Sequence, residues 1–210
     1  MPIIALTFDD GPNTVITPQV LDTLEENGAV GSFFLIAQNI TSESAEMVRR
    51  AKAMGCDIEN HSVTHPFMDK MDREQILEEV RGCTEKIVEI TGEEPRFFRP
   101  PFIAVNQEMY DLIDLTFICG AGCEDWVPEV TVQQRIDRVL ANAEDGQIVL
   151  LHDMQWNQNT ADALKVIIPE LKKKGFRFVT VSQLFKEKNV TPQRGWLYSN
   201  VLQTTSDNRL

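Results

Sequence analysis

The sequence has little of what several common classes of protein require. Its 210 residues contain 20 Lys and Arg against 32 Asp and Glu, which gives a formal net charge of −12. Nucleic acids and anionic membranes are bound through positive surface, so neither is an expected partner. No apolar run approaches the ~20 residues that a helix needs to span a bilayer. The length suits one domain that buries a core without disulfides or a structural metal.

Cysteine is scarce as well. The four cysteines, which form no CxxC pair, are Cys56, Cys83, Cys119 and Cys123. This number is too small for a disulfide scaffold and predicts buried free thiols. A thiol metal site at Cys119 and Cys123, which are four residues apart, is a weaker alternative.

Only three histidines are present, at positions 61, 65 and 152. Imidazole is the side chain that titrates near neutral pH, so any chemistry that uses it must use these positions. Met1 and Pro2 lead straight into an apolar strand without a secretory leader. This predicts either a cytoplasmic protein or one domain of a longer secreted chain. No heptad or apolar edge is evident, so we expect a monomer.

Short β-rich runs alternate with amphipathic stretches along most of the chain. The predicted strands are 3–8, 31–36, 56–60, 96–98, 116–119, 147–151 and 176–181, and the predicted helices are 17–27, 42–54, 72–91, 107–113, 132–142 and 160–174. This alternation predicts an α/β fold with a mostly parallel sheet and outer helices, and favours a closed or nearly closed barrel over an open sheet. We expect one domain over 1–185, followed by a tail over 186–210 that packs on the body or frays.

Polar residues with catalytic potential follow the predicted strands. In chain order the segments are TFDDGP from Thr7, HSVTHP from His61, RPPF from Arg99, EDW from Glu124, and His152 with Asp153. In a parallel barrel the carboxyl ends of the strands gather on one face, where active sites lie. All three histidines fall in these segments, which predicts one shared site.

The Asp9–Asp10 pair could simply form a turn, or it could contribute to a site. Asp-Asp-Gly-Pro is a favourable sequence for a turn, and adjacent residues on a strand point in different directions. His61 and His65 are four residues apart, a spacing that lets two imidazoles bind one cation. One carboxylate with these two imidazoles would give a three-ligand site, open to water, for Zn²⁺ or a related divalent ion.

The remaining polar residues suit acid–base work around such a site. The second aspartate could take a proton from water, and His152 could protonate a leaving group. Asp125 could fix the tautomer of an imidazole, and Arg99 could orient the base through a charge-assisted pair. For Asp153 we favour a structural role that braces the loop.

The order of these five motifs resembles the polysaccharide deacetylases, carbohydrate esterase family 4, over about residues 3–185. The resemblance implies a distorted (β/α)₇ barrel that removes acetyl groups from sugar polymers. It also implies one divalent metal ion, with zinc as the first choice and cobalt, nickel or manganese as alternatives. It implies Asp9 as base and Asp10, His61 and His65 as metal ligands. It implies His152 as acid tuned by Asp125, and Arg99 as the residue that orients Asp9.

The same resemblance assigns the pocket. The backbone N–H of Phe102 would help to stabilise the oxyanion, and Trp126 and Leu150 would form apolar walls, although core packing is an equal alternative for these two. Three positions depart from the family pattern: Phe102 stands where Tyr is frequent, Ile103 where Gly is frequent, and Gly122 where an acidic residue is frequent. Ile103 is expected to reshape the loop beside the acetyl pocket.

The segments 60–68, 98–106 and 118–126 resemble the bacterial acetylxylan esterase branch most, so O-acetylated xylan is the expected substrate. N-deacetylation of peptidoglycan or chitin oligomers is the alternative. Relatives of that branch are often domains of secreted plant cell-wall-degrading proteins, which favours an extracellular location within a longer chain. A carbohydrate-binding module without catalysis is a further alternative, and the complete set of catalytic and metal residues argues against it.

Overall fold

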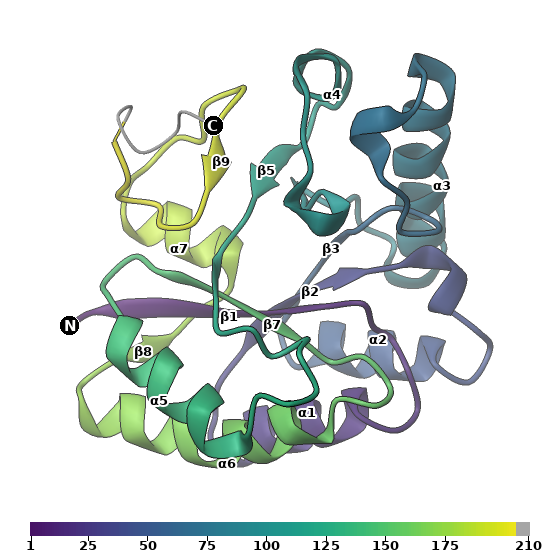
Figure 1. Ribbon diagram of the computed structural model, residues 1–210. Helices are drawn as coiled ribbons and strands as arrows, with labels where there is room; N and C mark the ends of the chain where they lie inside the picture. The colour runs from purple at the N-terminus through teal and green to yellow at the C-terminus, as the bar shows by residue number, and fades with distance from the viewer. Residues whose placement is uncertain (205–210) are drawn as a thin grey trace.

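A computed structural model of the protein describes residues 1–204 (Figure 1). The strands are β1 (Ile3–Asp9), β2 (Gly31–Leu35), β3 (Asp57–Asn60), β4 (Phe97–Phe98), β5 (Thr116–Ile118), β6 (Ala121–Gly122), β7 (Ile148–His152), β8 (Arg177–Phe178) and β9 (Leu197–Tyr198). The helices are α1 (Thr17–Glu26), α2 (Ala45–Ala53), α3 (Arg73–Thr91), α4 (Gln107–Leu112), α5 (Val132–Asn142), α6 (Gln158–Lys173) and α7 (Val181–Glu187), with 3₁₀ turns η1 (Ala37–Asn39), η2 (Met68–Lys70) and η3 (Pro101–Ile103).

Strand β1 is the centre of a parallel sheet whose strands follow the order β6-β7-β1-β2-β3-β4-β5-β9, with β8 pairing with β1 as well. Every residue of β1 is buried, as expected for a strand covered on both faces. The register pairs Asp9 with His152 on β7 and with Phe34 on β2. Two of the predicted catalytic residues therefore lie side by side at the carboxyl ends of neighbouring strands.

The sheet curls, and the segment around β9 joins its two sides. The backbone N–H groups of Cys119 and Gly120 both donate to the carbonyl of Tyr198, and the N–H of Ile148 donates to the carbonyl of Ser199. This segment thus connects β5 with the start of β7. The result is a curled parallel half-barrel with surrounding helices, which confirms the predicted (β/α)₇-type barrel.

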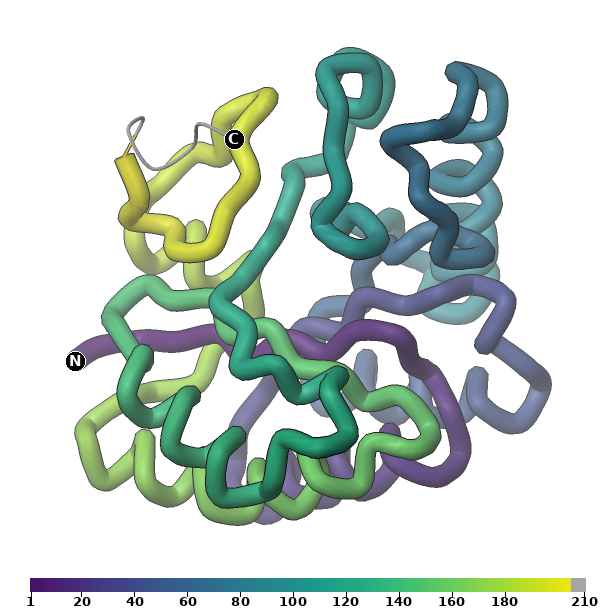
Figure 2. Tube along the Cα trace, viewed as in Figure 1, coloured from purple at the N-terminus to yellow at the C-terminus, as the bar shows by residue number. Residues whose placement is uncertain are grey.

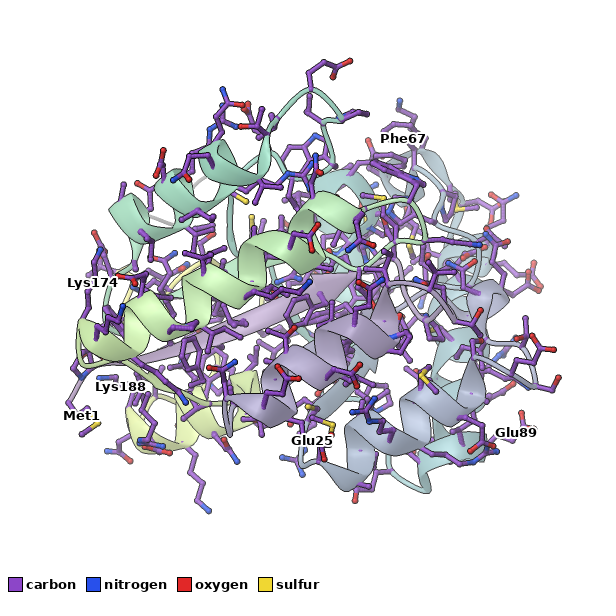
Figure 3. All side chains as sticks on the ribbon, turned by 90° about the horizontal axis from the view of Figure 1, so that it is seen from below. Met1, Glu25, Phe67, Glu89, Lys174 and Lys188 are labelled. Carbon is purple, nitrogen blue, oxygen red and sulfur yellow. The ribbon has the colours of Figure 1, made fainter. Side chains whose placement is uncertain are left out.

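Helices surround the sheet. Figure 1 shows α5, α6 and α1 as one layer below β1 and β7, with α3, α4 and α7 above. The Cα trace in Figure 2 shows β1 crossing the middle of the molecule from the N-terminus. Seen from below, α6 lies beside α1 (Figure 3). In the same view Phe67, which follows β3, lies on the opposite side of the molecule from Met1, which precedes β1. No helix of residues 1–204 is long and apolar enough to cross a membrane.

All six predicted helices are present, with ends that differ by a few residues, but the last predicted strand is partly wrong. Strand β8 covers only Arg177–Phe178, because Thr180 caps a helix that follows at once. The Thr180 hydroxyl accepts from the Gln183 backbone N–H, and the Gln183 side chain accepts from the Thr180 backbone N–H, a capping box. The predicted tail therefore begins inside α7, contains β9, and ends in residues 205–210, which lie outside the described part.

Candidate active site

The predicted site residues converge at the carboxyl ends of the strands around one cavity of about 370 Å³. Asp9 and His152 end β1 and β7, His61 directly follows β3, and Arg99 follows β4. The residues that line the cavity are Asp9, Asp10, His61, His65, Pro100, Phe102, Ile103, Trp126, Leu150, His152, Met154 and Trp156. Arg99 and Asp125 are fully buried behind this lining.

The two aspartates do not diverge as the alternation of a strand predicts. Strand β1 ends at Asp9, and Asp10 has a positive φ of 71°, so the chain leaves the strand geometry between them. Asp9 Oδ2 lies 3.7 Å and Asp10 Oδ1 3.4 Å from Nε2 of His61. Both carboxylates therefore face the same imidazole. Positive φ is uncommon outside glycine and clusters at functional sites.

His61 is held in one tautomer by the backbone. Its Nδ1 lies 2.6 Å from the carbonyl oxygen of Arg99, which can only accept, so Nδ1 carries the proton. Nε2 then faces Asp10 and Asp9. A carbonyl on the remote nitrogen is the usual support of a metal-binding histidine, and carboxylates opposite the other nitrogen suit a shared cation.

His65 completes a cluster of three candidate ligands. Its Nε2 lies 3.6 Å from Asp10 Oδ1, and the donor atoms of Asp10, His61 and His65 all lie within 4.8 Å of one another. Asp10 Oδ1 is buried and has no hydrogen-bond partner among residues 1–204. Burial and the neighbouring His61 lower the pKa of His65, which favours the neutral imidazole that binds metal. An orphaned carboxylate oxygen beside two imidazoles fits a divalent cation.

Asp10 is prepared for the same role. Burial alone would raise its pKa, but interactions with His61, His152 and His65 outweigh burial and lower the pKa to about 2. The carboxylate is therefore ionised near neutral pH. A metal ligand must be deprotonated, so this state suits binding.

Asp9 is oriented by a buried arginine. Nη1 of Arg99 lies 2.5 Å from Asp9 Oδ1, and the guanidinium carbon lies 4.2 Å from the centre of the Phe34 ring. Both members of the pair are almost completely buried. Stacking on Phe34 fixes the plane of the guanidinium, so the free oxygen of Asp9 is directed toward the cavity.

The third histidine, His152, pairs with a carboxylate, whereas His61 pairs with a carbonyl. Nδ1 of His152 lies 2.8 Å from Oδ1 of Asp125, and the His152 backbone N–H donates to Oδ2 of Asp125 over 2.7 Å. Burial alone would lower the pKa of His152, but Asp125, with Asp9 and Asp10 further away, raises it to about 9. His152 is therefore a cation near neutral pH and has a proton to donate.

A residue that sequence reasoning missed supports this pair. Arg135 on α5 is 1% exposed, and its Nη1 donates to Oδ1 of Asn157 and, over 2.8 Å, to the hydroxyl of Thr160. Asn157 and Thr160 in turn both donate to Oδ2 of Asp125. Arg135 thereby holds the two side chains that hold Asp125. It lies on the same helix face as Ile136 and Val139, and a charge on that apolar face was the available clue.

Trp126 and Leu150 both line the cavity. The Trp126 ring lies 5.5 Å from the His152 ring in an edge-on arrangement and remains 44% exposed, whereas Leu150 is buried. Gly122 explains the position of the indole, because a Cβ there would lie 3.2 Å from the Trp126 ring. The space that an acidic side chain would need at position 122 is occupied by Trp126.

The loop after β4 is strained at two of the positions that depart from the family pattern. Phe102 and Ile103 have positive φ values of 58° and 55°. For a β-branched residue this conformation is a genuine outlier, of order 1–3 kcal/mol. The Phe102 ring stacks on Phe67 at 4.0 Å and touches the His65 ring at 4.5 Å. Ile103 thus has a backbone conformation that glycine would adopt without strain, and the change of loop shape expected there stays a prediction.

Asp153 lies beneath the loop that connects β1 with α1. Its Oδ2 accepts from the Thr17 hydroxyl at 2.5 Å, and a Cβ on Gly11 would lie 2.6 Å from that oxygen. Complete burial, opposed by the Thr17 hydrogen bond, raises the pKa of Asp153 to about 7. These contacts are those of a side chain that braces the loop.

The thiols lie elsewhere. All four cysteines are free, and three of them are buried. Cys119 donates to the carbonyl of Gly120, and burial raises the pKa of Cys123 to about 12. Within residues 1–204, the cluster of His, Cys, Asp and Glu with donor atoms close enough for one cation is that of Asp10, His61 and His65. The alternative thiol site therefore has no support.

Comparison with known proteins gives one consistent assignment. Residues 1–116 match the family model for polysaccharide deacetylase. The chain is 46% identical over 200 residues to a bifunctional xylanase/deacetylase of Pseudobutyrivibrio xylanivorans, which covers 95% of this chain but only 33% of that protein. The chain thus spans about a third of that relative's length. Peptidoglycan deacetylases of Listeria monocytogenes and Bacillus subtilis are 34% and 33% identical.

Solved structures agree over almost the whole chain. The Xyl-CE4 domain of a multidomain xylanase from the hindgut metagenome of Trinervitermes trinervoides is 45% identical, with a TM-score of 0.93 over 95% of this chain and 98% of that one. A family 4 acetyl xylan esterase from Clostridium thermocellum, in complex with a cobalt ion, is 36% identical, with a TM-score of 0.92 over 96% and 100%. The resemblance inferred from the motifs is confirmed, and the chain belongs to the polysaccharide deacetylase family, carbohydrate esterase family 4.

Proposed function

We propose that this domain hydrolyses acetyl groups from a polysaccharide, with O-acetylated xylan as the substrate. One observation carries the proposal: a single cavity holds a carboxylate oriented by Arg99, an imidazole charged by Asp125, and a cluster of three metal-type ligands. A base, an acid and a Lewis-acid site together are what hydrolysis of an unactivated ester or amide needs.

The cofactor in this proposal is one divalent ion held by Asp10, His61 and His65. Zinc suits two imidazoles and one carboxylate best, and cobalt, nickel or manganese are alternatives. When bound, such an ion supplies Lewis acidity that lowers the pKa of water towards ~7. The structure of one relative is in complex with a cobalt ion, which supports a metal of this class without selecting zinc.

The residues of the chain then divide the proton transfers. Asp9 accepts a proton from the water whose oxygen attacks the acetyl carbonyl carbon, and Arg99 holds it in place. As the tetrahedral intermediate collapses, the bond from carbon to the sugar oxygen breaks and His152 donates its proton to that oxygen. Acetate and a free hydroxyl are the products. The backbone N–H of Phe102 is the proposed donor to the oxyanion, and Trp126 and Leu150 are the proposed walls around the methyl group.

One observation supports xylan over GlcNAc polymers. The relatives with the highest identities quoted above are named as a xylanase/deacetylase and a domain of a multidomain xylanase. The cavity lining carries carboxylates and no Lys or Arg among the described residues, which suits a neutral polymer of either kind. We further propose that the domain works as a monomer within a larger secreted protein that degrades plant cell walls. N-deacetylation of GlcNAc polymers is the alternative, since it uses the same groups.

The test is acetate release by the metal-loaded protein from acetylated xylan, acetylated chitooligosaccharide and peptidoglycan, measured side by side. Xylan should give the highest kcat/KM. Higher turnover of a GlcNAc polymer would establish the alternative. Asp9→Ala should release no acetate above background. Full release by Asp9→Ala would reject the mechanism, and no release by the wild type from any substrate would favour a binding module.

A further inference from the structure

We propose that a second cavity beside the catalytic one binds the sugar unit next to the acetylated sugar, with Trp156 as the platform on which this unit stacks. This cavity has a volume of about 530 Å³. It shares four lining residues with the catalytic cavity, namely Asp10, His65, Met154 and Trp156. The two cavities therefore adjoin each other, and we treat them as one groove for a polymer. The inference rests on the proposed function, because it places a polysaccharide in that groove.

Trp156 stands at the junction of the two cavities. It is 57% exposed, the most exposed of the large hydrophobic residues after Met1 within the described range 1–204. The other tryptophans rest on rings, Trp126 on His152 and Trp196 on Tyr198, whereas Trp156 has no ring contact among residues 1–204. An exposed indole in a groove is a binding feature more often than a structural one. The C–H face of a pyranose ring is apolar, so it can cover the indole and leave the hydroxyls free.

The walls of the second cavity offer unused hydrogen-bonding groups. Thr14, Gln38, Glu43 and Gln155 line it, and their side chains form no hydrogen bond or ion pair with any residue from 1 to 204. Asn13, in contrast, is occupied by structural bonds: its amide donates to the carbonyl of Asp153, and its oxygen caps the start of α1. Free amides and a hydroxyl provide both donors and acceptors, as sugar hydroxyls require.

The charge of the groove limits the sugar. The lining of both cavities, as far as the structure describes it, contains the carboxylates of Asp9, Asp10 and Glu43 and no Lys or Arg. A uronate or phosphorylated sugar would bring a negative charge beside Glu43, with no Lys or Arg in the lining to balance it. The expected ligand is therefore a neutral pyranose unit of the polymer, from either a xylose or a GlcNAc chain.

The first experiment measures binding of oligosaccharides to the chelated protein by calorimetry, so that it does not depend on turnover. Xylohexaose, chitohexaose and a galacturonic acid hexamer are titrated into the wild-type protein and into Trp156→Ala, Trp156→Phe, Gln38→Ala and Val166→Ala. Val166 on α6 is 41% exposed and lines neither cavity, so it is the matched control. Trp156→Ala should weaken binding of the neutral hexamers by about tenfold or more. Trp156→Phe should recover part of this loss, and Gln38→Ala should weaken binding by a smaller factor.

The second experiment compares kcat/KM for an acetylated hexamer with kcat/KM for an acetylated monosaccharide. The ratio should exceed one in the wild type and fall by about tenfold in Trp156→Ala. The hexamer that binds more tightly, xylose or GlcNAc, identifies the source of the sugar. The inference is overturned if neither neutral hexamer binds, if Trp156→Ala binds within twofold of the Val166→Ala control, or if the uronate binds as well as xylohexaose. Failure of the proposed function would differ, since acetate release would be absent while binding still depended on Trp156.

Discussion

His61 and His152 lie in one cavity and differ in the atom that faces Nδ1. His61 meets the carbonyl oxygen of Arg99 at 2.6 Å, whereas His152 meets a carboxylate oxygen of Asp125 at 2.8 Å. Both acceptors place the proton on Nδ1 and turn Nε2 toward the cavity. The carbonyl is a neutral acceptor, whereas the carboxylate of Asp125 favours the cation of His152, which carries a second proton on Nε2. The charge of one buried partner thus distinguishes the proposed metal ligand from the proposed acid.

The most severe way to break this comparison is to remove the ligand histidine. His61→Ala should lose both metal and activity, falling to the level of the wild type treated with a chelator, because two ligands do not hold a divalent ion tightly. Metal content and acetate release are measured on the same sample. Excess metal that restored full turnover to His61→Ala would show that His61 is not a ligand.

Removal of the acid should separate the two properties. His152→Ala should keep its metal and lose about 10²- to 10⁴-fold in kcat, since general acid catalysis contributes this much. Metal analysis beside kinetics makes the contrast with His61→Ala direct. Loss of metal from His152→Ala would mean that the two histidines share the ligand role.

Asp125→Asn replaces the carboxylate that pairs with His152 by a neutral amide oxygen, which resembles the carbonyl that pairs with His61. The pKa of His152, raised to about 9 in the wild type, should fall towards its ordinary value of 6.5. Because the acid must be protonated, activity should decline at lower pH in the variant than in the wild type, with more residual activity at pH 6 than at pH 8. The pH profile of kcat measures this shift.

Folding stability gives an independent check on the same variant. A pKa raised in the folded state stabilises the protein below 6.5, and this contribution is lost as the pH rises to about 9. Urea unfolding of chelated protein should therefore show a smaller loss of stability between these pH values in Asp125→Asn than in the wild type. Identical slopes would mean that Asp125 does not set the charge of His152.

The smallest expected effect is at Arg135. Lysine in its place cannot make the bonds to Asn157, Thr160 and the carbonyls of Val130 and Val127 together. Arg135→Lys should lower stability by about 1–3 kcal/mol and kcat by a few-fold, with little change in KM. Arg138→Lys, a half-exposed position on the same helix paired with Glu124, is the matched control. Equal effects in both variants would show that Arg135 does not position the Asp125–His152 pair.

Sequence reasoning found the residues at the strand ends, because a parallel barrel gathers them at one face and five short motifs mark them. It missed contacts that depend on tertiary structure. The carbonyl of Arg99 as partner of His61 has no side-chain pattern, and the two-residue strand β9 is too short to show alternation. Helix α7 was predictable in principle, since Thr180 and Gln183 have the spacing of a capping box.

The pairing of β1 has a consequence for the order in which the protein folds. The first strand to be synthesised needs β7 on one side, about 140 residues later, and the seam between β5 and β7 waits for Tyr198 and Ser199. Contacts of such sequence separation slow folding and leave strand edges open to wrong partners until they form. The Asp9–His152 register exists only after β7 has paired with β1. A ribosome-bound chain that stops short of β7 should therefore hold its candidate metal ligands without a finished acid–base pair.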